Sequence, residues 1–66
     1  MSLAEAVLFR AQLMRDMAAD NLRGHRKFRD SDTPACRELA DWYEGRYMAY
    51  KNAAKIMRET VEVYAC

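Results

Sequence analysis

The sequence predicts an all-α protein, in which two long helices fold into an antiparallel hairpin that assembles into a four-helix bundle dimer or a larger helical oligomer. Three observations support this expectation. Apolar residues recur every three or four positions through most of the chain, which is the spacing of a helical stripe. Only two glycines and one proline interrupt it, which favours few, long elements. A chain of 66 residues is sufficient for a single domain, residues 1–66.

The first helix is expected over about residues 3–28. Ser2 is a good N-cap, and Glu5 follows three positions later, as in a capping box. A stripe of apolar spacing then comprises Leu3, Val7, Ala11, Met14, Ala18, Leu22 and His25. Gly24 costs up to about 1 kcal/mol against alanine inside a helix, so an earlier helix end at Gly24 is the alternative.

Residues 29–33 form the predicted turn, because Asp30, Ser31 and Asp32 are turn and cap formers. The second helix is expected over about residues 34–64, with Pro34 in its first turn. A short loop between two helices makes them antiparallel neighbours. The apolar stripe of this helix comprises Leu39, Trp42, Tyr43, Arg46, Ala49, Tyr50, Ala53, Ile56, Met57, Thr60, Val63 and Tyr64.

Folding the hairpin at this turn predicts its interface. Ala18 is expected near Gly45, and Met14 near Ala49. Small residues would then form the centre of the interface: Ala11, Ala18, Gly45, Ala49 and Ala53. A lone hairpin of this size buries too little surface to be stable, so we expect self-association through a second seam made of Trp42, Tyr43, Tyr50, Met57 and Tyr64.

Composition excludes several classes of protein. A net charge of +1 gives no general attraction to nucleic acid or anionic lipid, and no apolar run approaches the length of a membrane span. With no export signal in the first residues and with Cys36 and Cys66 expected to be unpaired, we predict a cytoplasmic protein, in the host cytoplasm if a phage encodes it. The sequence has no metal-ligand spacing and no nucleophilic triad, so we expect no enzyme, no metal and no cofactor.

Basic residues gather near the predicted turn: Arg23, Arg26, Lys27 and Arg29. They are candidates for contacts with phosphates of a nucleic acid, with Phe28 stacking on a base. The alternative is a solvated helix end, because cations favour the C-terminus of a helix dipole.

Arg46 lies within the apolar stripe of the second helix. One interpretation pairs it with Asp20, Glu38 or Asp41, which would fix the register. The other makes it an anion ligand, with Tyr43 and Tyr50 completing a nucleotide pocket between protomers. For the tyrosines the alternative is subunit packing.

Phe9 and Leu13 project from the polar side of the first helix, four residues apart. Neighbouring exposed apolar side chains mark a contact surface. The pair is expected to be either a second oligomer contact or a docking site for another protein.

In length and hairpin pattern, the whole chain resembles the small dimeric helical-hairpin regulators of plasmids and phages, of the repressor-of-primer type. No motif matches residue by residue, so no functional residue is carried over. Small size, the lack of a catalytic motif, the second seam and the pair Phe9 and Leu13 favour a non-enzymatic regulatory protein, phage- or mobile-element-encoded, that binds and inhibits another macromolecule. Two alternatives are an oligomer that holds a nucleotide or other small anion between protomers, and an RNA- or DNA-binding hairpin that uses the basic turn.

Overall fold

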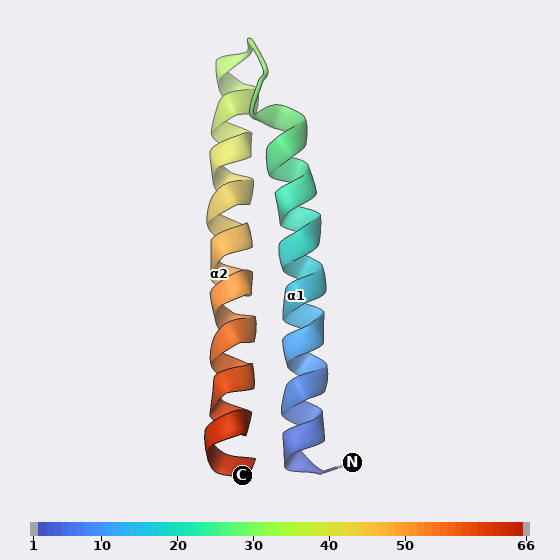
Figure 1. Ribbon diagram of the computed structural model, residues 1–66. Helices are drawn as coiled ribbons and strands as arrows, with labels where there is room; N and C mark the ends of the chain where they lie inside the picture. The colour runs from blue at the N-terminus through green and yellow to red at the C-terminus, as the bar shows by residue number, and fades with distance from the viewer. Residues whose placement is uncertain (1, 66) are drawn as a thin grey trace.

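The computed structural model describes residues 2–65, and side chains through Tyr64. It contains helix α1 (Leu3–Phe28) and helix α2 (Pro34–Ala65). The helices lie side by side and antiparallel, with the turn at one end and both chain ends at the other (Figure 1). The resulting rod measures 50 × 18 × 11 Å between Cα atoms, which confirms the predicted all-α hairpin.

Local capping explains where the helices begin. The Ser2 hydroxyl oxygen accepts a hydrogen bond from the Glu5 backbone N–H at 3.1 Å, and the same hydroxyl donates to the Glu5 carboxylate at 3.3 Å. α2 begins where the Arg37 backbone N–H donates to the Thr33 carbonyl at 3.1 Å, with Pro34 as its first residue. Helix α1 passes through Gly24 without ending. Neither helix, within residues 2–65, combines the length and apolar character needed to cross a membrane. Cys36 is a free thiol. Cys66, which was also expected to be unpaired, lies outside the described residues.

The buried side of α1 follows a strict seven-residue repeat. Its buried and half-buried members, alternately three and four residues apart, are Ala4, Val7, Ala11, Met14, Ala18, Asn21, His25 and Phe28. This is the spacing of a coiled-coil seam. It shares most of its residues with the predicted stripe, but Asn21 rather than Leu22 lies at its centre.

The buried side of α2 differs from the prediction. It has the same repeat and comprises Cys36, Ala40, Tyr43, Tyr47, Tyr50, Ala54, Met57 and Val61. The predicted central positions Gly45 and Ala49 are wrong, because both residues are exposed and a Cβ on Gly45 would meet nothing within 4 Å. The helix has two adjacent apolar stripes, and periodicity alone does not state which one faces α1.

Three contacts between the helices fix the register. His25 Nδ1 lies 3.0 Å from the Ala40 carbonyl oxygen. Arg46 Nε donates to Asn21 Oδ1 at 3.1 Å. The Tyr43 ring lies over Gly24, so closely that a Cβ there would be 2.7 Å from a ring carbon. Here a large ring of α2 packs against the smallest residue of α1, and this contact is made with the tyrosine stripe facing inward.

The core of the hairpin is thin. Its buried residues are four alanines, at positions 11, 18, 40 and 54, and Asn21. Among the described residues, no larger side chain is fully buried. Because burial of large apolar side chains supplies most of the stabilisation of a fold, this single interface provides little of it.

Candidate interaction surfaces

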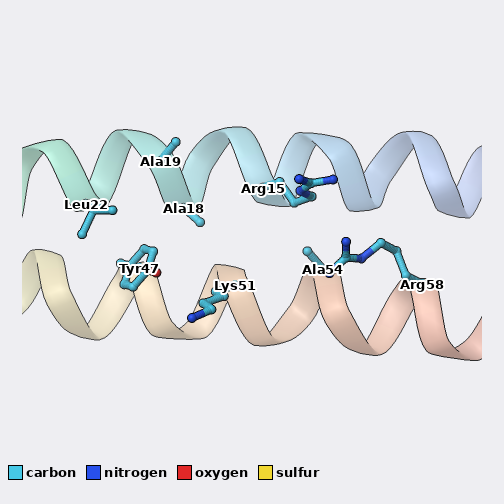
Figure 2. Close-up of a pocket in the computed structure, with 8 residues that line it drawn as sticks. All are labelled: Arg15, Ala18, Ala19, Leu22, Tyr47, Lys51, Ala54 and Arg58. Atoms are coloured by element: carbon cyan, nitrogen blue, oxygen red, sulfur yellow. The ribbon is translucent and has the colours of Figure 1, made fainter.

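The seam has two flanks, which differ in chemistry. On one flank a groove runs between the helices, with α1 contributing Arg15 and Leu22, and α2 contributing Lys51 and Arg58 (Figure 2). The second flank is formed by the residues that border the seam of each helix on the side opposite this groove. It carries Met17 of α1 and Leu39, Arg46 and Ala53 of α2.

The second flank continues into a broad apolar surface, called the apolar face below. It is made of Leu3, Leu13, Met17, Leu39, Trp42, Ala49, Ala53, Ile56 and Val63. Several members are strongly exposed, including Ile56 at 62% and Trp42 at 54%. At the open end of the hairpin, a groove of about 390 Å³ joins it, lined in part by Leu3, Val61 and Tyr64. Contiguous exposed apolar surface of this extent marks an interaction site.

The predicted oligomer interface is divided between two places. Tyr43, Tyr50 and Met57 are half-buried in the seam within one chain. Trp42 belongs to the apolar face, and Tyr64 is exposed at the open end. The residues that remain accessible to a second chain are therefore mainly those of the neighbouring stripe of α2, beside the predicted set on the helix surface.

Arg46 lies at the border between the seam and the apolar face. Its guanidinium donates to Asn21 Oδ1 at 3.1 Å and to the Tyr50 hydroxyl at 3.2 Å. It also lies over the Trp42 ring, 4.7 Å from the centroid, and 5.4 Å from the Tyr50 centroid. The Asn21 amide nitrogen donates to the Met17 carbonyl at 2.7 Å. An amide and two aromatic rings, rather than a carboxylate, hold this cation in place.

These contacts bear on the predicted partners of Arg46. No ion pair joins Arg46 to a carboxylate in the described part of the chain, and Asp20 instead pairs with Arg23. Tyr50 does lie beside Arg46, as predicted. Tyr43 is held elsewhere, with its ring in edge contact with Trp42 at 5.0 Å between centroids. The structure thus brings together two of the three residues proposed as a nucleotide site.

The basic residues near the turn are largely engaged. Arg23 pairs with Asp20, and Arg29 Nε lies 3.5 Å from an Asp30 carboxylate oxygen. Lys27 Nζ lies over the Phe28 ring, 5.4 Å from its centroid.

Phe28 itself stacks on Tyr43, with centroids 6.1 Å apart and the planes 6° from parallel. A base would have to displace this packing to reach the Phe28 ring. Arg26 remains exposed and has no ion pair among the described residues.

Phe9 and Leu13 are exposed, at 59% and 43%. Leu13 belongs to the apolar face. Phe9 lies nearly opposite the seam of α1, because it occupies the position of the seven-residue repeat that is farthest round the helix from the seam residues. It therefore sits at the outer edge of the apolar face and points away from α2.

Sequence reasoning missed the groove of Arg15, Lys51 and Arg58, called the basic groove below. Its volume is about 350 Å³. In Figure 2 the guanidinium groups of Arg15 and Arg58 extend toward one another across the gap between the helices. One signal was present in the sequence: Arg15 and Lys51 have no acidic residue three or four positions away on either side, so neither has a partner on its own helix.

Within residues 2–65, no group of three or more histidine, cysteine, aspartate or glutamate side chains is placed to hold a metal ion. Comparison of the chain with family models, with curated proteins and with solved structures gave no match. The two surfaces that flank the seam are therefore the candidates for function.

Proposed function

We propose that this protein is a non-enzymatic interaction protein, which self-associates through the apolar face and binds and inhibits another macromolecule. The observation that carries the proposal is the apolar face, which runs along α2 from Leu39 to Val63 and along α1 from Leu3 to Met17, with Arg10 and Arg46 as charged residues within it. The proposed role is the one expected from the sequence, a small regulator encoded by a phage or mobile element.

The thin core supports self-association. A layer of helices is stable when its apolar side is covered by another layer, and the hairpin's own interface buries only alanines and Asn21. The missing large apolar residues are present, but on the apolar face, where Ile56 and Trp42 remain exposed. Covering this face would supply about 1.5–3 kcal/mol for each large side chain removed from water.

A second copy of the chain is the occupant that fits best. The face lies on the broad side of a hairpin whose Cα extents are 50 × 18 × 11 Å. A second hairpin has the same length and the same two-helix width. Two hairpins packed face to face form a four-helix bundle.

Phe9 provides the argument for a further partner. Its side chain lies at the outer edge of the apolar face, so packing of two hairpins on that face leaves it accessible. A large exposed aromatic residue beside an apolar surface is typical of a docking site. We therefore assign docking of the inhibited macromolecule to the surface around Phe9.

Light scattering during size-exclusion chromatography tests the self-association. Wild-type protein is expected to have the mass of two chains or more. Ile56→Lys places a charge in the apolar face and is expected to reduce the mass toward one chain. Met48→Lys is the matched control, because Met48 is exposed to 46% but lies off the apolar face. A monomeric wild type, or equal effects of both variants, would contradict the proposal.

Phe9→Ser tests the docking surface separately. The variant is expected to keep the oligomeric mass of the wild type and to lose a macromolecule that copurifies with tagged wild-type protein. Retention of that macromolecule at wild-type levels would remove Phe9 from the account. A reduced mass would instead place Phe9 in the self-association interface.

A further inference from the structure

We infer that the basic groove binds a small phosphorylated ligand with a planar or apolar group, of the nucleotide class. Arg15 of α1 and Lys51 and Arg58 of α2 supply its charge. None of the three has an ion pair among the described residues. Arg10, Arg26 and Arg37 also have none, but only the first three cations line one groove together.

The carboxylates near the groove leave the charges of Arg15 and Lys51 uncompensated. Glu44 lies 3.6 Å from His25, and Glu59 lies 3.9 Å from Lys55. Toward the open end, Arg58 also borders a second hollow, which it shares with Lys55, Glu59 and Glu62. These glutamates do not line the basic groove, so Arg15 and Lys51 face a site with no anion of its own.

Cations meet across this flank. Flanking positions of an antiparallel coiled coil usually carry opposite charges that pair across the seam. The contacts that fix the register place Lys51 opposite Arg15, and the Arg58 guanidinium extends along the groove toward that of Arg15 (Figure 2). Like charges in this arrangement repel, and an anion between them reverses the sign of the interaction. Paired guanidinium groups offer forked N–H donors that match the oxygens of a phosphate.

The remaining lining residues define the other half of the ligand. Between the cations, the groove has an apolar floor of Ala18, Ala19, Leu22 and Ala54, together with Tyr47. In Figure 2 Leu22 and Tyr47 extend into the gap from opposite helices. Lys51 Nζ lies over the Tyr47 ring, 5.6 Å from its centroid. We therefore place a planar group against Leu22, beside this ring, with its phosphates between Arg15 and Arg58. The volume of about 350 Å³ is within the range of small-ligand sites.

A compact ligand fits better than a nucleic-acid strand. A strand is held by cations spaced along its backbone. Toward the turn, this flank continues on α1 to Arg29, which already pairs with Asp30, and on α2 it is interrupted by the carboxylate of Glu44 before it reaches Arg37. The uncompensated charge is concentrated at one place instead. The groove also lies within a single hairpin and on the flank opposite the apolar face, so this inference does not depend on self-association.

Isothermal titration with ATP, AMP, adenosine and inorganic pyrophosphate tests the inference. ATP is expected to bind more tightly than AMP, and adenosine not measurably. Arg15→Gln or Arg58→Gln is expected to weaken ATP binding at least about tenfold, the effect of losing one charge-assisted contact. Arg10→Gln is the matched control, because Arg10 is also exposed and has no ion pair among the described residues but lies on the opposite flank. It is expected to leave ATP binding unchanged.

Three results would overturn the inference: no heat of binding for any phosphate-bearing probe, equal loss on Arg10→Gln, or tighter binding of a poly(U) oligonucleotide than of ATP. The last result would indicate a nucleic-acid surface. Each variant is also weighed by light scattering, and the groove variants are expected to keep the wild-type mass. Loss of ATP binding with unchanged mass separates this site from the self-association surface.

Arg15→Glu gives a second readout that requires no ligand. If Arg15 faces Lys51 and Arg58 as described, the glutamate will pair with these cations, and the thermal midpoint will rise while ATP binding is lost. No acidic residue lies three or four positions from residue 15, so a fall in the midpoint would show that the cations of α2 are not close to it, which contradicts the inferred site.

Discussion

The two flanks of the seam differ although both follow the same seven-residue repeat. On α2, the residues directly before the seam residues Ala40, Tyr47 and Ala54 are Leu39, Arg46 and Ala53, of which two are apolar. The residues of the opposite flank, Glu44, Lys51 and Arg58, are all charged. The apolar face therefore exposes large apolar side chains, which the small core of the single hairpin does not bury. The basic groove has charge to neutralise. A short hairpin can thus hold its helices together with small residues and leave each flank for a different interaction.

The largest expected effect comes from Trp42, which lies on the apolar face. Trp42→Ala removes a large ring, 54% exposed in the single hairpin, from both copies of the proposed interface. Loss of a buried interface tryptophan costs about 2 kcal/mol or more per copy, so the dimer Kd is expected to rise about a thousandfold. Sedimentation equilibrium measures this change. Met48→Ala on the other side of α2 is the control, and an equal effect of the two variants would erase the distinction between the surfaces.

Asn21 tests the polar contact that joins the seam to the apolar face. Asn21→Ala leaves the Arg46 Nε donor without its 3.1 Å acceptor in a half-buried place. The expected loss in the free energy of unfolding is about 1–3 kcal/mol, measured by urea denaturation. An unchanged urea midpoint would show that water or the Tyr50 hydroxyl serves Arg46 equally well.

The two glycines make a matched pair. Alanine at Gly45 points into open space and is expected to stabilise the helix by up to about 1 kcal/mol through its higher helix propensity. Alanine at Gly24 has the same gain in propensity, but its Cβ would lie 2.7–2.8 Å from Tyr43 ring carbons. Gly24→Ala is therefore expected to lower the thermal midpoint and Gly45→Ala to raise it. A rise in both would mean that the Tyr43 ring moves easily.

The smallest expected effect concerns the start of α1, near the open end of the apolar face. Ser2→Ala removes the acceptor of the Glu5 backbone N–H. The expected cost is about 0.5–1 kcal/mol, at the low end for an N-cap because the helix can fray there. Circular dichroism would show a small loss of helix, and Ser2→Asp should restore it. If Ser2→Asp also loses helix, capping does not define this end.

Local signals in the sequence predicted the helices well. Ser2 and the cap formers before Pro34 mark the starts, and the apolar repeat of α1 identified Ala11 and Ala18 as buried. The orientation of α2 was not predictable in this way, because its two apolar stripes lie side by side. The choice between them depends on contacts across the hairpin, such as Tyr43 on Gly24.

The candidate sites follow the same rule. Exposure of Phe9 and Leu13 was predictable from one helix alone. The basic groove combines Arg15 of α1 with Arg58 of α2, residues far apart in the sequence. Their proximity depends on the register between the helices. Because the predicted hairpin turned the wrong stripe of α2 toward α1, it could not bring these two residues together.

The most direct test of the central claim, that the apolar face is buried against a second copy, is the thermal unfolding midpoint at a series of protein concentrations. Folding that is coupled to association becomes more favourable as protein concentration rises. We predict that the midpoint, followed by circular dichroism, increases steadily with concentration in the wild type and less in Ile56→Lys. A wild-type midpoint that is the same at all concentrations would show that the single hairpin is stable alone, and would contradict the account.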